Sequence, residues 1–183
     1  MDWYSIVKFL HVAFAVVWVG GGFTIMLLAV RAERAGNVDG MLQTMRATGE
    51  LGNRLFMPAS MLTLLSGLTL CWFWIGFTDL WVIIGLIGFA TTASIGSMIF
   101  KPTADRMTAM IAKDGITPAV LDVGRRILKI ARLDYTVMLI VIAAMVLKPT
   151  SGDTAILAAM VVALLAGLYA AFGNPGRSRP AAA

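Results

Sequence analysis

The chain has 183 residues, 59% of them hydrophobic, and a mean hydropathy of +0.84. This composition predicts an integral membrane protein and leaves no room for a separate soluble domain. The formal net charge is +5, but 13 of the 15 Lys and Arg residues fall in loops or in the tail, on what would be one side of a membrane. Because such loops lie beside anionic lipid, we attribute the positive charge to them and expect no nucleic-acid partner.

The hydrophobic runs predict an all-α bundle of five transmembrane helices. A helix needs about 20 apolar residues to cross a bilayer, and the runs at 5–30, 55–77, 81–100 and 154–172 are long enough. A fifth run, 135–147, is shorter. It spans if its helix begins within 127–134, where basic side chains can extend to the interface. We expect one bundle over residues 1–173 and a flexible cytoplasmic tail over 174–183.

The distribution of charge predicts the orientation. Cytoplasmic loops carry the excess of Lys and Arg, and only Lys8 and Lys148 would lie on the other side. We therefore expect the amino terminus outside and the carboxyl terminus inside, in a multi-pass protein of the inner (plasma) membrane of a bacterium. The first helix is too long, and too poorly preceded by positive charge, to be a cleaved signal.

The connections between the helices are mostly short. A segment from Met41 onward is expected to be helical and to run into the second span, where Pro58 invites a kink. Residues 78–80 join the second and third spans into a hairpin. Residues 101–132 form the largest soluble element, in which Thr117 is expected to cap a helix that begins at Pro118.

Small residues recur at a spacing of four along the last span. Such a stripe allows the close approach of another helix in lipid. We expect either a packing ridge within the chain or a docking face for a homo-oligomer or another membrane protein. The residues are Ala159, Ala163, Gly167 and Ala171.

His11 is the only histidine, and it lies roughly 10 Å inside the first helix at 1.5 Å per residue. An ionisable residue at that depth is a candidate functional residue. Lys8 and Trp18 share its helical face, and Gly21 lies in a run of three glycines that would admit a flat ligand. The alternative is a histidine hydrogen-bonded to a neighbouring helix.

A metal bound to His11 would need other ligands. The second span offers Met57 and Met61 on one face, and a histidine with a thioether suits haem iron or Cu(I). The alternative for these methionines is contact with lipid or with the protein core.

Asp134 stands where the third loop meets the fourth span, near the inner interface. It is a candidate to cap that helix, to pair with Arg54 or Lys101, or to line a polar entrance. The runs at 55–77 and 81–100 contain no charged residue, which argues against a proton-coupled transporter of ordinary design. No motif for a nucleophile or a phosphate loop is present, so we assign no catalytic residue.

Three stretches resemble one superfamily of membrane proteins. They are Lys8, His11, Trp18 and Gly21; Met57-Pro58 with Gly67; and Asp134 onward to Leu147-Lys148-Pro149. The superfamily groups HemJ-type protoporphyrinogen oxidases, the copper-resistance D family and a family of predicted integral membrane proteins of unknown function. The resemblance covers about 150 residues, and the last branch is the most similar.

Each branch implies a different role. The oxidase branch implies haem b bound through His11, although the third span here lacks that branch's lysine and histidine, and Leu133-Asp134 replaces its Asn-Glu pair. The copper branch implies metal uptake. Three functions stay open: a haem- or porphyrin-associated protein, a copper or small-solute permease, and a non-catalytic membrane accessory protein.

Overall fold

The computed structural model describes residues 2–173, which contain helices and no strand. Five continuous helical segments are long and apolar enough to cross a membrane, which confirms the predicted all-α architecture and the number of spans. The side of the membrane on which each terminus lies stays a prediction. The segments are Trp3–Arg34, Val38–Ile75, Leu80–Asp114, Pro118–Leu147 and Thr154–Phe172.

The first three segments are interrupted by π-helical turns. One at Val16–Gly20 separates α1 (Trp3–Ala15) from α2 (Gly21–Arg34). The second segment consists of α3 (Val38–Leu51), a turn at Gly52–Phe56, α4 (Met57–Leu70) and a turn at Cys71–Ile75. The third consists of α5 (Leu80–Ile95), a turn at Gly96–Phe100 and α6 (Lys101–Asp114). Each π-helical turn contains an extra residue compared with an α-helical turn. The residues that follow it therefore point to a different side of the helix than they would in an unbroken α-helix.

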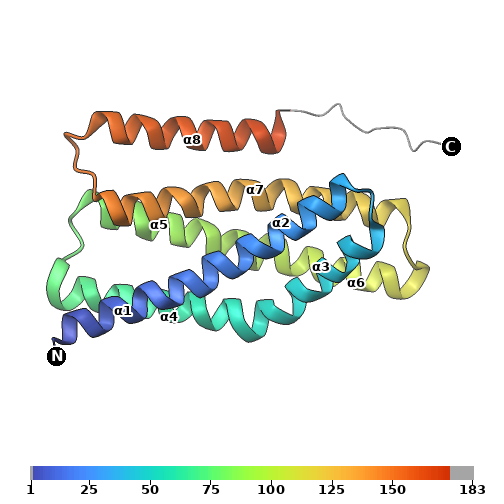
Figure 1. Ribbon diagram of the computed structural model, residues 1–183, viewed down its shortest axis with the longest axis horizontal. Helices are drawn as coiled ribbons and strands as arrows, with labels where there is room; N and C mark the ends of the chain where they lie inside the picture. The colour runs from blue at the N-terminus through green and yellow to red at the C-terminus, as the bar shows by residue number, and fades with distance from the viewer. Residues whose placement is uncertain (1, 174–183) are drawn as a thin grey trace.

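The long axes of the helices run in roughly the same direction, and the helices pack against one another in pairs (Figure 1). α1 lies against α4, α2 against α3, and α5 against α7 (Pro118–Leu147), while the main neighbour of α8 (Thr154–Phe172) is α7. We call one end of the bundle the basic end; its connections are residues 35–37 and 115–117. The other is the hairpin end, with connections at residues 76–79 and 148–153.

The expected third loop is mostly helical. Thr117 occupies the N-cap position of α7 in an extended conformation but its side chain makes no capping hydrogen bond, and Pro118 begins the helix as predicted. The expected start of this helix within residues 127–134 is wrong, because α7 runs without a break from Pro118 to Leu147. Its 30 residues make a helix about 45 Å long at 1.5 Å per residue, which exceeds the hydrocarbon core of about 30 Å.

The extension is helical because it has its own apolar contacts. Val120, Gly124 and Leu128 lie one turn apart on α7 and are buried, as is Met107 of α6. The Sδ–Cε end of Met45 lies over Gly124. Helices that would be marginal alone in water are stabilised by such packing, and the bundle therefore continues past the bilayer at its basic end.

Candidate functional site

His11 is held against the backbone of α4. Its Nδ1 lies 2.8 Å from the carbonyl oxygen of Thr63, with the Ser66 hydroxyl at 3.4 Å. A carbonyl oxygen only accepts, so Nδ1 carries the hydrogen and its N–H donates a hydrogen bond to the Thr63 carbonyl oxygen. In the neutral ring, Nε2 then keeps a free lone pair. This contact agrees with the alternative interpretation, in which the histidine is hydrogen-bonded to a neighbouring helix.

Gly67 makes the approach of the imidazole possible. A Cβ at position 67 would lie 2.9 Å from Cε1 of His11 and 3.1 Å from Nδ1, but 3.9 Å from Nε2. The Cε1–Nδ1 edge of the ring therefore rests on the bare backbone of α4, and Nε2 lies farther from it. A histidine that donates one ring N–H to a backbone carbonyl while its other nitrogen is free has the arrangement typical of a metal ligand.

The other residues of the predicted face do not converge on His11. Lys8 is exposed, with its Nζ 5.5 Å from the ring centroid of Tyr4. Trp18 meets Phe89 of α5 edge to face at 5.4 Å between centroids. The prediction assumed an unbroken repeat of 3.6 residues, but Trp18 lies within a π-helical turn, which changes the register between His11 and the residues that follow.

The glycines of the first segment are close to aromatic side chains. A Cβ on Gly21 would lie 2.8 Å from Cε1 of Phe56, and one on Gly22 would overlap Oη of Tyr135. Gly20 has nothing within 4 Å of such a Cβ. The space at Gly21 and Gly22 that we expected to admit a flat ligand is therefore occupied by the protein's own rings.

Met57 and Met61 lie on the outside of the bundle. Their exposed fractions are 51% and 45%, and the helical repeat places them on a different face of α4 from Thr63, which is 7% exposed. They do not approach His11 within the same chain. In the described residues, no group of three or more His, Cys, Asp and Glu side chains gathers as a metal cage would require.

Asp134 is buried in the middle of α7 rather than capping it. It is 3% exposed, and its Oδ1 has no hydrogen-bond partner. The expected pairing with Arg54 or Lys101 is wrong, because the ion pairs within residues 2–173 are Arg132–Glu33 at 2.9 Å and Arg125–Asp122 at 2.8 Å. Arg132, the basic residue nearest in sequence, is therefore already paired with Glu33.

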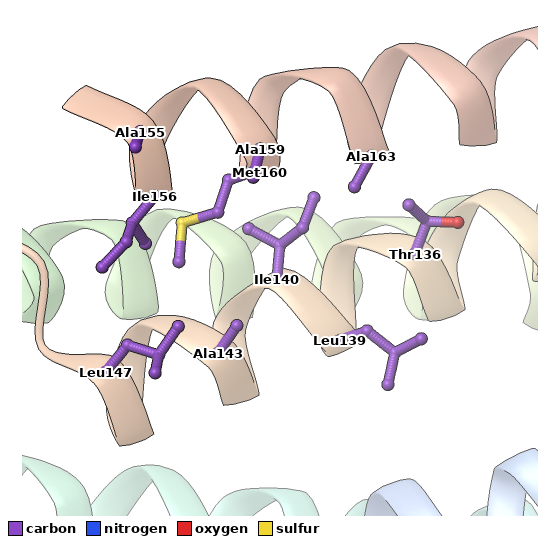
Figure 2. Close-up of a pocket in the computed structure, with 10 residues that line it drawn as sticks. All are labelled: Thr136, Leu139, Ile140, Ala143, Leu147, Ala155, Ile156, Ala159, Met160 and Ala163. Carbon is purple, nitrogen blue, oxygen red and sulfur yellow. The ribbon is translucent and has the colours of Figure 1, made fainter. Parts of the chain in front are cut away.

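The small-residue stripe of α8 faces α7 (Figure 2). Ala155, Ala159 and Ala163 line a cavity of about 460 Å³ between the two helices, opposite Ile140 and Ala143. A Cβ on Gly167 would lie 2.6 Å from Oγ1 of Thr136. Only part of the stripe is thus a packing ridge within the chain: Gly167 meets Thr136 and Ala171 is buried, whereas Ala159 and Ala163 are exposed along the cavity. The prediction that it docks a second protein stays a prediction.

A second, more polar cavity of about 450 Å³ lies at the hairpin end, between residues 78–83 and 148–151. Lys148 has a left-handed backbone with φ of 47°, and its Nζ lies 5.1 Å from the ring centroid of Trp81. Nε1 of Trp81 donates to Asp79 at 3.2 Å. The contacts fasten the α4–α5 turn to the α7–α8 connection.

Sequence reasoning missed the partners of the two buried ionisable residues. Thr63 contacts His11, and the packing of α5 on α7 places Thr92 beside Asp134. The hydrophobic pattern carries no signal for either, because a threonine inside a span usually donates to its own helix. The only indication was the depth of His11 itself.

The fold and the composition of its helices define a polytopic helical membrane protein. A family model matches residues 5–149, which is well over half of the chain. The chain belongs to that family, described as predicted integral membrane protein (DUF2269). No curated protein matches the chain, and no solved structure matches it.

Proposed function

We propose that this protein binds haem b, or another flat metalloporphyrin, at the surface formed by α1 and α4, with Nε2 of His11 as an axial ligand. The observation that carries the proposal is the 2.8 Å contact from Nδ1 to the Thr63 carbonyl oxygen. The contact fixes the tautomer and the ring orientation and leaves Nε2 as the ligating atom.

Met57 and Met61 of the same chain would not help to hold the group, because both side chains are on another face of α4. A second protein ligand would have to come from a second copy of the chain. When bound, a haem would provide one-electron redox chemistry. The protein's own contribution is to hold the imidazole through Nδ1 and to leave Nε2 without a hydrogen-bond partner among the described residues.

The protein is proposed to lie in the inner (plasma) membrane of a bacterium with its basic end in the cytoplasm. The support is the distribution of Lys and Arg, since basic loops stay on the cytoplasmic side.

The test is the absorption of the detergent-purified full chain titrated with haemin, followed by a reduced-minus-oxidised spectrum. We expect a Soret band that is lost in His11→Gln, since glutamine can still donate to the Thr63 carbonyl but offers no imidazole. Gly67→Ala should weaken binding, because its Cβ would lie 2.9 Å from the ring. The matched control Gly49→Ala has nothing within 4 Å and should behave like the wild type.

Met57→Leu and Met61→Leu should leave the spectrum unchanged. Equal haemin binding by the wild type and His11→Gln would overturn the proposal. Binding of Cu(I) instead of haemin, lost in His11→Gln, would favour the copper permease. An inert wild type would favour the accessory protein.

A further inference from the structure

Asp134 lies deeper in the bundle than its place in the sequence suggests. The axis of α7 carries it about 20 Å from Leu147 at the hairpin end, at 1.5 Å per residue. The hydrocarbon core is about 30 Å thick, so with Leu147 at one edge of that core the carboxyl group would lie about 10 Å inside the other edge. An ionisable residue at such a depth is rare outside functional sites.

Among the described residues, no cation forms an ion pair with this carboxyl group. On α7, Arg132 pairs with Glu33 of α2 at 2.9 Å, and Lys129 is exposed. α5 and α8 contain no Asp, Glu, Lys, Arg or His, and the charged residues of α2 and α6 form no ion pair with Asp134 in the described residues. These residues are Arg31, Glu33, Arg34, Lys101, Asp105, Arg106, Lys113 and Asp114.

Thr92 of α5 is the polar residue beside Asp134. Its hydroxyl differs in its hydrogen bonding from the hydroxyls of the nearby Thr and Ser residues. Thr91 donates to the carbonyl of Ile87 at 2.8 Å, and Ser94 and Ser97 also donate to carbonyls four residues back at 2.8 Å. Thr92, which is 6% exposed, makes no such bond within its helix in the described structure. The packing of α5 on α7, in which Gly88 meets Val137 and Val141, places Thr92 one turn further along, beside Asp134.

The chemical groups of Asp134 and Thr92 determine which kind of ligand the two residues can bind. An unpaired carboxylate is very costly to bury in an apolar interior, whereas a neutral carboxylic acid costs much less. A hard metal ion needs about six oxygen ligands, and one carboxyl with one hydroxyl is too few. A proton needs a single oxygen, and Oδ1 of Asp134 is buried without a partner.

The surroundings also indicate where a proton would enter. Tyr135 lies against Gly22 and Phe23, so aromatic packing closes the side toward α2. Toward the basic end, the paired side chains of Arg132 and Glu33 are 36% and 26% exposed. Arg132 is the charged residue of α7 nearest in sequence to Asp134, so this partly exposed ion pair lies beside the site toward the basic end.

We propose that Asp134 and Thr92 form a proton-binding site inside the membrane, which exchanges its proton with the solution at the basic end. On release, the O–H bond of the Asp134 carboxyl breaks and the proton passes to water, leaving a carboxylate that accepts a hydrogen bond from the Thr92 hydroxyl. On uptake the same step runs in reverse. The site needs no haem, so this proposal can be tested independently of the proposed role of His11.

Labelling with dicyclohexylcarbodiimide tests the site, because this apolar reagent adds to protonated carboxyl groups within membranes to give an N-acylurea with no atom lost. The full chain in liposomes should give one adduct, mapped by peptide mass spectrometry to Asp134. The adduct should disappear in Asp134→Asn, persist in Asp105→Asn, and decrease as the pH is raised. No adduct at Asp134, or labelling that does not depend on pH, would overturn the proposal. Protection by Na⁺ at constant pH and ionic strength would show a cation site instead.

Infrared spectroscopy tests the partner. The carbonyl stretch of the protonated acid should be absent in Asp134→Asn and should move to higher frequency in Thr92→Val, because valine removes the hydrogen bond. Thr91→Val is the matched control, since the Thr91 hydroxyl bonds to its own helix, and it should leave the band in place. An unshifted band in Thr92→Val would remove Thr92 from the site.

Discussion

Oη of Tyr135 on α7 lies against the backbone of Gly22 on α2, at a position that a Cβ on Gly22 would overlap. Phe23 meets the same tyrosine ring edge to face at 5.7 Å. This contact joins the first segment to the fourth, and it requires a residue without a side chain at position 22.

Gly22→Ala should therefore destabilise the protein, by about 1–3 kcal/mol as expected for an overpacked contact. Gly20→Ala is the control, because a Cβ there meets nothing within 4 Å. Unfolding of both variants by a denaturing detergent in mixed micelles would measure the difference. Equal losses would show that the Tyr135 contact does not limit the packing of α2 on α7.

The Arg132–Glu33 ion pair joins two helices, whereas Arg125–Asp122 lies within α7. A double-mutant cycle on Arg132 and Glu33 should give a coupling energy of about 1 kcal/mol, toward the upper range for partly exposed pairs. The cycle on Arg125 and Asp122 should give less, because those side chains are 53% and 70% exposed. A larger coupling for the second pair would contradict this ranking.

Gly167→Ala should weaken the packing of α8 on α7, because the new Cβ would lie 2.6 Å from Oγ1 and 2.8 Å from Cγ2 of Thr136. Thr136→Ala removes both atoms and should restore most of the lost stability in the double variant. Proteolysis and detergent unfolding of the single and double variants would measure the effect. If the stability changes of the two single variants simply added in the double variant, the two residues would not be in contact.

The connection between α7 and α8 should loosen in acid. The backbone N–H and the hydroxyl of Thr150 donate to Oδ2 of Asp153 at 2.8 and 2.7 Å, and these bonds lower the pKa of Asp153. A lowered pKa means that the stabilisation is present above the unfolded value of about 3.9 and is lost as the pH falls through the folded value. Hydrogen exchange at the Thr150 amide should accelerate there, and Asp153→Asn should be fast at neutral pH. Asp105→Asn should leave that amide protected.

The boundaries of several helices follow directly from the sequence. The last span, predicted at 154–172, matches α8, and α7 ends before Lys148 as expected. Pro118 begins α7 because its missing N–H costs nothing at a helix start. These signals are local, so hydropathy and turn residues are enough to find them.

The placement of the candidate residues depends on tertiary contacts instead. A lone aspartate beside Arg132 is typical of a cap or an ion pair, and only the packing of α5 on α7 shows that Asp134 is buried. The π-helical turn at Val16–Gly20 likewise changes which residues share a face with His11. Hydrophobic periodicity contains neither piece of information.

The family match ends at residue 149, and α8 begins at Thr154 against α7. The four segments that precede α8 are even in number, so Trp3 and Leu147 lie at the same end of the bundle, whereas Phe172 lies at the other (Figure 1). Gain or loss of this one helix would switch the compartment in which a C-terminal fusion is displayed, and the four matched segments would not need to invert.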